Sequence, residues 1–329
     1  MIISSAPLRV SFNGGGSDLP SFFAHEEGFT VTASLKQSVH VMINKSFYPE
    51  YRIAYSRLER TKSRSEISHP IVRSVLEILG CDDFLEIASV ADVPSTGSGL
   101  GTSSAFTVAL LNGIASYMGK SLSPKRLAEL ACEVEINMCK SPIGKQDQYA
   151  SAFGGVNQFY FKSNESVEHT ELIANEELES QLVNELNKHS LFFHIDVPRQ
   201  TNEILEKQNN KLRELVQARE IVTSMVDLAH QSSECLKDGN IRGLGKLLTA
   251  GWMKKMDLNG DSDSTNMKGI LDLLLTSNAH GGKLLGAGVG GFLFVLANEQ
   301  DHGEIARKFS QLKRVKFEFA SNRPVVRSV

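Results

Sequence analysis

The stretch PSTGSGLGTSSA, residues 94–105, has glycine at alternate positions in its centre and three hydroxyl residues after the last glycine. A short strand-like run at residues 85–90 precedes it, and an almost wholly apolar run at residues 103–118 follows it. This order predicts a strand, a tight loop and a buried helix. Alternate glycines let backbone N–H groups turn toward an anion, and the positive end of the helix points to the same place. The sequence therefore predicts a phosphate-binding loop.

This loop differs from the usual nucleotide-binding P-loop, because the lysine of the GxxxxGK[ST] pattern is missing. Hydroxyl groups at Thr102, Ser103 and Ser104 could instead reach a metal ion or a terminal phosphate oxygen. The alternative is a tight strand-to-helix connection in which these side chains only cap the helix.

Two further windows share the high glycine content. Twelve of the 26 glycines lie in Gly14–Gly16, Gly97–Gly101 and Gly281–Gly291, so glycine is concentrated at three loops. The third window contains the pattern GxGxxG, but it opens onto the strand-like run Phe292–Val295. A dinucleotide-binding loop opens a helix instead. We therefore reject that interpretation and expect a close approach of the backbone to something small.

Carboxylates flank a loop in the segment EINMCKSPIGKQDQ, residues 135–148. Glu135 belongs to a predicted helix, and Asp147 follows Pro142 and Gly144 at the start of the next element. Such a pair can converge on one metal-phosphate site, and phosphoryl transfer needs a metal ligand and a carboxylate near the attacking hydroxyl. The alternatives are a solvated helix face for Glu133 and Glu135, and a helix cap for Asp147.

Composition limits the class of protein. A chain of 329 residues with 41% hydrophobic and 22% charged residues is long enough for two globular domains. A net charge of -3 does not favour a nucleic-acid or polybasic membrane protein. No apolar run reaches the roughly 20 residues of a membrane span, and the N-terminus has no signal pattern. With four cysteines in no metal-binding spacing, we expect free thiols in a cytoplasmic protein, as a monomer or homodimer.

Periodicity and breaker residues divide the chain near residue 188. The expected domains are residues 1–187 and 188–329. The first contains expected strands at 2–12, 30–33, 39–43, 85–90 and 156–161, a solvated loop at 57–66, and helices at 71–79, 103–118 and 127–138. The second contains expected strands at 189–197, 292–297 and 315–320, and helices at 202–237, 241–256, 267–277 and 305–312.

Together, the three glycine windows resemble the three motifs of the GHMP kinases, the superfamily of galactokinase, homoserine kinase and mevalonate kinase. The segment APLRVSFNGGGSD, residues 6–18, is similar to the galactokinase pattern APGRVNLIGEHTD, and GLGTSSA and KLLGAGVGG are similar to the second and third motifs. The resemblance covers essentially the whole chain. It implies an α+β fold, with a ribosomal protein S5 domain 2-like N-terminal domain that binds ATP and a ferredoxin-like C-terminal domain.

Carried onto this sequence, the resemblance implies a role for each matched residue. Asp147 would orient or deprotonate the attacking sugar hydroxyl, and Arg9 would stabilise charge beside it. Asp18 would accept hydrogen bonds from the sugar, and Ser104 and Glu135 would hold Mg²⁺. The implied ATP-binding residues are Pro94, Gly97, Ser98, Gly99, Leu100, Gly101, Thr102, Ser103 and Ser104.

Other residues bear on which sugar is bound. Gly15 and Gly16 stand where galactokinases have a Glu-His pair, which argues against galactose and assigns these glycines to the sugar pocket. Gly288 would help to shape the substrate side. The motifs look most like the D-glycero-D-manno-heptose 7-phosphate kinase branch, and a phosphorylated heptose needs cations of its own. We expect Lys145, close to Asp147, and Arg199, after the first strand of the second domain, to supply them.

The resulting hypothesis is a kinase that uses ATP and Mg²⁺ to phosphorylate the anomeric hydroxyl of a heptose 7-phosphate, giving the 1,7-bisphosphate. One alternative is a kinase of a free sugar such as L-fucose or another hexose. A second is an ATP-consuming decarboxylase of the diphosphomevalonate type, and a third is a sugar sensor without catalysis. Retention of Ser104, Glu135 and Asp147 favours an active kinase over the sensor.

Overall fold

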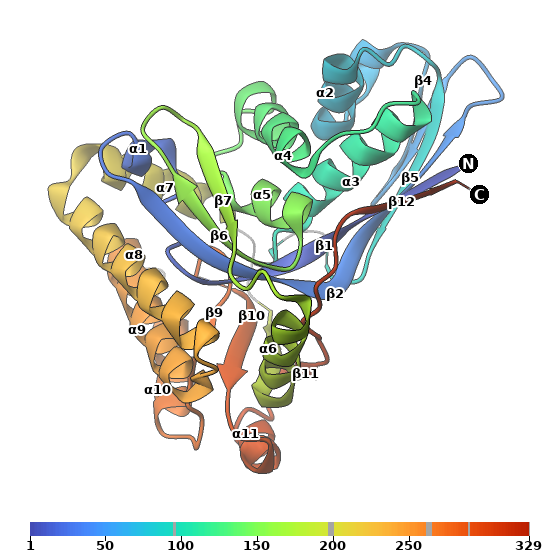
Figure 1. Cartoon of the computed structure of the whole chain (residues 1–329). Helices are drawn as coiled ribbons and strands as arrows, with labels where there is room; N and C mark the ends of the chain where they lie inside the picture. Colours follow the sequence, from blue (N-terminus) through green and yellow to red (C-terminus); the bar gives the residue numbers. More distant parts are fainter. Residues whose placement is uncertain (95–96, 197–200, 261–264, 289, 329) are drawn as a thin grey trace.

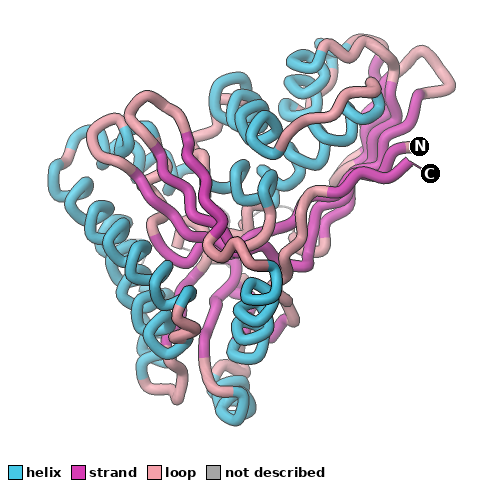
Figure 2. The backbone as a smooth tube through the Cα atoms, in the orientation of Figure 1, coloured by secondary structure: helices cyan, strands magenta, loops and turns pink. Residues whose placement is uncertain are grey.

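The computed structural model describes residues 1–94, 97–196, 201–260, 265–288 and 290–328, with the backbone alone at residues 201–202 and 265–266. Over these ranges the chain forms an eight-stranded mixed sheet and a four-stranded antiparallel sheet, with helices packed around both (Figures 1 and 2). Mixed helix and sheet content confirms the predicted α+β class. Among the described residues, no helix is both long and apolar enough to cross a bilayer.

The first sheet has the strand order β12-β1-β2-β5-β3-β4, and β6 and β7 extend it from the other part of β2. Its strands are β1 (Ile2–Asn13), β2 (Gly28–Lys45), β3 (Tyr51–Ala54), β4 (Leu58–Thr61), β5 (Leu85–Ala91), β6 (Val156–Phe161), β7 (Val167–Glu171) and β12 (Val325–Ser328). Helical elements of this part are α1 (Pro20–Phe23), the 3₁₀ turn η1 (Arg64–Glu66), α2 (Pro70–Leu79), α3 (Thr102–Tyr117), α4 (Pro124–Cys132), the π-helix η2 (Glu133–Met138), α5 (Gln146–Phe153) and α6 (Glu176–His189).

The second sheet has the order β11-β8-β10-β9. Along the chain its elements alternate as strand, helices, two strands, helix and strand, which is the ferredoxin-like pattern that we expected. The elements are β8 (Ser190–Ile195), α7 (Thr201–Glu214), α8 (Val216–Lys237), α9 (Ile241–Asn259), α10 (Thr265–Leu275), β9 (Gly281–Leu284), β10 (Gly291–Leu296), η4 (Glu299–Asp301), α11 (His302–Lys308) and β11 (Lys313–Val315).

Helix α3 is the centre of the N-terminal core. It packs against β1 and β2, with α2, α4 and α5 beside it (Figure 1). Val108, Leu111 and Ile114 are wholly buried, as the apolar run predicts. Burial of such side chains contributes about 1.5–3 kcal/mol each. The phosphate-loop end of α3 is thereby held rigidly against β1.

Several expected elements differ from the structure. The two strands expected at 30–33 and 39–43 are parts of the single strand β2, which exchanges β6 for β5 as its neighbour. The expected loop at 57–66 contains β4, and the side chain of Glu59 is buried there. The helix expected at 202–237 is interrupted by Leu215, whose backbone is extended. Strand β11 ends at Val315, because the following segment bonds its backbone to β2 at Ser34 and Lys36 instead.

The boundary expected near residue 188 stays a prediction. The second sheet begins at Ser190, yet β12 returns to the first sheet and pairs with β1 from Ile2 to Ser5. Helix α8 also packs on β1 and β2. The two parts are therefore joined by a continuous core as well as by the chain. The four cysteines are free thiols.

Candidate active site

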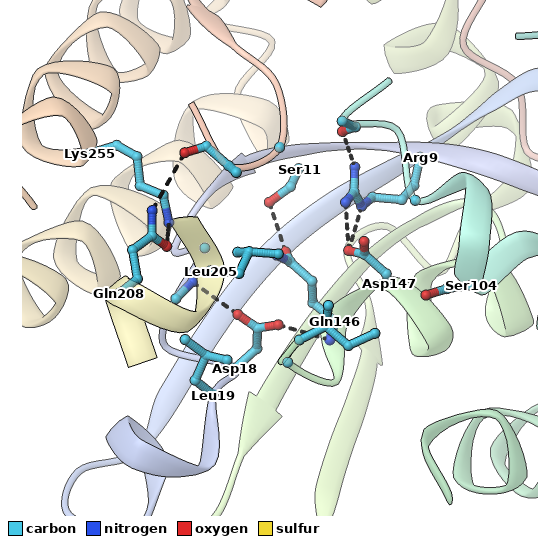
Figure 3. Close-up of a pocket in the computed structure, with 18 of the residues that line it drawn as sticks. Arg9, Ser11, Asp18, Leu19, Ser104, Gln146, Asp147, Leu205, Gln208 and Lys255 are labelled. Atoms are coloured by element: carbon cyan, nitrogen blue, oxygen red, sulfur yellow. Dashed lines mark hydrogen bonds and ion pairs between the residues drawn. The ribbon is translucent and has the colours of Figure 1, made fainter. Parts of the chain in front are cut away.

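A cavity of about 560 Å³ lies where the three glycine windows meet. Strand β1, the loop before α3, the start of α5, helices α7 and α9, and the third glycine window all contribute to its lining. Figure 3 shows the side chains from these elements turned toward one another. Segments far apart in the sequence thus converge on one site.

The loop before α3 presents the N-terminus of that helix to this cavity. Gly101 caps the helix in a left-handed conformation, φ 74°, and no side chain of the described residues caps it. The hydroxyls of Ser98 and Thr102 lie 2.7 Å apart, and Ser98 accepts a hydrogen bond from the Leu100 amide at 3.2 Å. These bonds hold the turn while the first amides of α3 stay available for an anion.

Glycines of the second and third windows lie back to back. A Cβ atom on Gly99 would lie 2.4 Å from the main-chain oxygen of Leu285, and one on Gly286 would lie 2.6 Å from the Gly99 Cα. A Cβ atom on Gly291 would similarly meet the Gly97 oxygen at 2.6 Å. Only glycine permits this approach. The third window therefore supports the phosphate loop from behind.

Glu135 is buried beneath the phosphate loop, on the π-helix η2. Its two carboxylate oxygens accept hydrogen bonds from Ser103 Oγ at 2.6 Å, Ser104 Oγ at 2.7 Å and Gln148 Nε2 at 2.8 Å. Burial raises the pKa of Glu135, and these three hydrogen bonds oppose the rise. A widened turn at this position is typical of functional sites. It puts the carboxylate directly against two hydroxyls of α3.

Arg9 and Asp147 form a hydrogen-bonded ion pair at the floor of the cavity. Arg9 donates from Nε at 2.8 Å and from Nη2 at 2.6 Å to the same oxygen, Oδ1, of Asp147. Its third nitrogen donates to the Gly99 carbonyl at 2.7 Å. Arg9 is 4% exposed, whereas Asp147 is 27% exposed. No group of the described residues donates to the other Asp147 oxygen, so that oxygen can accept from a ligand in the cavity.

Asp18 lies in the middle of the cavity, at the end of the first glycine window. Its oxygens accept from the amides of Gly16 at 2.9 Å and Gln146 at 3.2 Å. Burial raises the pKa of Asp18 and the charge of Asp147 adds to the rise, while these hydrogen bonds oppose it. A Cβ atom on Gly144 would lie 2.0 Å from Oδ2 of Asp18, which explains the need for glycine there.

Most of the residues expected from the sequence do converge. The cavity lining includes Arg9, Gly15, Gly16, Asp18, Gly97, Ser98, Gly99, Gly101, Thr102, Ser103, Ser104 and Asp147. Glu135 lies behind the lining, in contact with two of its serines. Leu100 is buried away from the cavity, Pro94 is exposed outside it, and Gly288 packs beside Lys255 and Asn259.

Of the two cations expected to bind a sugar phosphate, Lys145 is not in the lining. The Lys145 ammonium donates to the Glu165 carbonyl at 2.8 Å and lies over the Phe23 ring at 5.1 Å. It is therefore engaged outside the cavity, because the chain turns at this residue as α5 begins. Arg199 lies outside the described residues.

The sequence interpretation missed several polar groups that line the cavity. Lys255 and Gln208 come from α9 and α7, and Lys283 comes from β9 within the third glycine window. Gln146 is held by Ser11, with its Oε1 accepting at 2.9 Å. In the sequence, Lys255 resembles a solvated charge on a helix, so only its burial identifies it.

Sequence profiles of known families match two parts of the chain. The GHMP kinase N-terminal domain matches residues 69–155, and the GHMP kinase C-terminal domain matches residues 232–314. The chain belongs to the GHMP kinases. The first profile covers the phosphate loop together with Glu135 and Asp147, and the second covers Lys255 and the third glycine window. Membership of the GHMP kinases confirms the family and fold that the motifs predict.

Individual proteins of known activity or structure are similar to this chain. A D-glycero-alpha-D-manno-heptose 7-phosphate kinase of Campylobacter jejuni is 26% identical, over 89% of this chain and 88% of the relative. A galactokinase of Thermotoga petrophila is 28% identical, over 66% of this chain and 67% of the relative. The crystal structure of a D-glycero-D-manno-heptose 1-phosphate kinase from Bacteroides thetaiotaomicron has a TM-score of 0.81 at 23% identity, covering 100% of this chain and 99% of that one. This GHMP kinase therefore has the fold of sugar-phosphate kinases.

Proposed function

We propose that this GHMP kinase transfers the terminal phosphoryl group of ATP to the anomeric hydroxyl of a heptose 7-phosphate, giving the 1,7-bisphosphate. One observation carries the proposal. The carboxylate of Asp147, held by Arg9, shares a cavity with the uncapped N-terminus of α3. A nucleophile-orienting group and a phosphate-binding group are thus presented to the same ligand space.

The residues present fit ATP and Mg²⁺. Free amides at the start of α3 suit phosphate oxygens. The carboxylate of Glu135 and the hydroxyl of Ser104 are the oxygen ligands that Mg²⁺ accepts, and this ion commonly takes only one or two protein ligands beside phosphate oxygens. When bound, the ion would neutralise charge on the phosphates. Ser104 now donates to Glu135 at 2.7 Å, so both oxygens already lie side by side.

The chain's own groups supply the remaining chemistry. The carboxylate of Asp147 accepts a hydrogen bond from the attacking sugar hydroxyl. It thereby orients the hydroxyl oxygen and receives its proton. Arg9 holds Asp147 by two N–H groups and keeps its guanidinium beside the charge that develops. Asp18 accepts hydrogen bonds from other hydroxyls of the sugar. Direct transfer follows, without a covalent intermediate on the enzyme.

The choice of a heptose 7-phosphate has two supports. The Campylobacter jejuni relative with that activity aligns with most of both chains, and the cavity lining includes Lys255 and Lys283. Kinases of free sugars in the same family, such as the galactokinase of Thermotoga petrophila, are the alternative. Four free thiols suit a reducing compartment, so we assign the reaction to the cytoplasm.

ADP release across a panel of heptose 7-phosphates, unphosphorylated hexoses including L-fucose, and mevalonate tests this function. We expect the highest kcat/KM with a heptose 7-phosphate. The variant Asp147→Asn should lower kcat by at least about 100-fold, because it removes the proton acceptor, and should still bind ATP. Asp227→Asn, an exposed position on α8, is the control. A near-normal kcat for Asp147→Asn, or ADP release only with mevalonate, would contradict the proposal.

A further inference from the structure

Three lysines, Lys211, Lys255 and Lys283, differ in how many acceptors their ammonium groups have. Lys211 donates to two main-chain oxygens at the end of α9, at 2.7 and 3.1 Å. Lys283 donates to two main-chain oxygens of β1, both at 3.0 Å. These two lysines hold segments of backbone together. Lys255 makes no such bridge within the described residues.

Lys255 is 9% exposed and lines the cavity. Within the described part of the chain its ammonium makes one hydrogen bond, to Gln208 Oε1 at 2.9 Å, and no ion pair. An ammonium has three N–H donors, so two have no acceptor there. A buried charge with unfilled donors is costly unless a partner arrives. The cavity is the place from which that partner can come.

The charges around Lys255 favour an anionic partner. Burial lowers the pKa of Lys255 to about 8, and the charge of Asp18 opposes this. Burial lowers the pKa of Lys283 to about 7, and the nearby charges of Lys255 and Arg9 add to this effect. The other nearby carboxylate in the lining, Glu203, is exposed. Among the described residues, Lys255 is therefore a buried lysine that forms no ion pair with a carboxylate.

Gln208 fixes the direction in which Lys255 points. Its Oε1 accepts from Lys255, while its Nε2 donates to Asn259 and reaches the Ala287 carbonyl at 3.5 Å. Gln208 is 1% exposed, so this arrangement is built into the packing of α7 and α9. The ammonium is thereby tied to the third glycine window and held facing the cavity.

The cavity has two chemically distinct ends. Figure 3 shows Lys255 and Gln208 on one side and Arg9 with Asp147 on the other, with Asp18 between them. A sugar whose reacting hydroxyl contacts Asp147 and whose other hydroxyls contact Asp18 extends toward Lys255. The group at that end of the sugar meets a buried cation with unfilled donors.

We propose that Lys255, positioned by Gln208, binds the phosphate group that the sugar carries at the end opposite its reacting hydroxyl. The inference rests on the proposed function and adds a specificity-determining residue to it. Lys255 takes the role that the sequence suggested for Lys145 and Arg199. It makes the enzyme prefer a sugar phosphate over the same sugar without phosphate, because only the phosphate supplies anionic oxygens to the ammonium.

The test compares two substrates in each of three variants. The substrates are heptose 7-phosphate and the same heptose without phosphate, and the quantity is the ratio of their kcat/KM values. We expect Lys255→Met to lower this ratio at least thirtyfold. Lys255→Arg keeps the charge, so its ratio should be at least about threefold higher than that of Lys255→Met. Lys254→Met, the exposed neighbour on α9, should leave the ratio within a factor of two.

The results that would overturn the inference about Lys255 differ from those that would overturn the proposed function. Equal losses of kcat/KM for both substrates in Lys255→Met would show that Lys255 acts only through Asp18 or through folding, and would overturn the inference. Titration calorimetry with heptose 7-phosphate provides the separate readout. If no sugar releases ADP with the unmodified enzyme, the proposed function fails. The inference then still requires a Kd at least thirtyfold weaker in Lys255→Met, and an unchanged Kd, or no binding to the unmodified enzyme, overturns it.

Discussion

Replacing Gly99 by alanine should damage the site by a calculable route. The backbone at Gly99 has φ +71°, where a Cβ atom costs about 1–2 kcal/mol. The new Cβ atom would also lie 2.4 Å from the Leu285 oxygen and 2.6 Å from its carbonyl carbon. Ordinary contacts of this kind need about 3.5 Å, so the two loops separate by about 1 Å. Displacement of a binding group by 1 Å can lower a rate by about 100-fold.

Gly119 supplies a matched control. Its φ is +72°, but a Cβ atom there would meet nothing within 4 Å. Gly119→Ala thus shares the conformational cost and lacks the collision. We expect urea unfolding to show a loss of about 1–2 kcal/mol for Gly119→Ala and about 2–4 kcal/mol for Gly99→Ala. In steady-state assays, only Gly99→Ala should lower kcat/KM for ATP, by about 100-fold.

Two results would refute this reasoning. If Gly99→Ala keeps its kcat/KM for ATP within threefold, the contact with the third glycine window does not position the phosphate loop. If Gly119→Ala weakens ATP use as much as Gly99→Ala does, the effect arises from general destabilisation.

Two further predictions concern buried charges. Glu135→Gln keeps the shape of a side chain that accepts hydrogen bonds from two serines and Gln148. Because the substitution removes the carboxylate proposed to hold Mg²⁺, kcat should fall at least 100-fold at any Mg²⁺ concentration, and a kcat within threefold of the original contradicts the assigned role. Because it also removes a buried charge, Tm should stay at or above the original value. Lys255, whose pKa is lowered from 10.5 to about 8, binds its proton more weakly in the folded than in the unfolded chain. Its contribution to the free energy of unfolding therefore rises between pH 8 and pH 10.5, by up to about 3 kcal/mol, and the difference from Lys255→Met in urea unfolding measures it. A difference that does not change with pH contradicts this cause.

The sequence predicted those parts of the site that depend on local backbone chemistry. The tight turn at Gly97–Gly101 needs glycine at alternate positions because of its backbone conformation. The apolar run after it predicts a buried helix. The carboxylates of Glu135 and Asp147 flank a short loop, and this spacing allowed them to converge. These features were visible because each has a cause within about ten residues.

Features that depend on distant packing could not be predicted in this way. Lys255 belongs to a helix whose exposed and buried lysines, Lys254 and Lys255, are adjacent in the sequence. Which of them faces inward is decided by how α7 and α9 pack together. Lys145 adjoins the site in sequence, but the chain directs its side chain toward Glu165. The π-helical turn at Glu135 likewise has no marker in the sequence.

Strand β12 has a consequence for the order in which the molecule can be completed during synthesis. Val325–Ser328 is made some 320 residues after its partner strand β1. Phe12 also stacks on Phe319, with ring centroids 6.1 Å apart. After the other strands of the first sheet are made, residues 188–328 still take roughly 7 to 28 seconds to emerge, at about 5–20 residues per second. During that interval the outer edge of β1 is open to pairing with other chains, so the nascent protein depends on its own late segment, or on a chaperone, to protect the strand that carries Arg9.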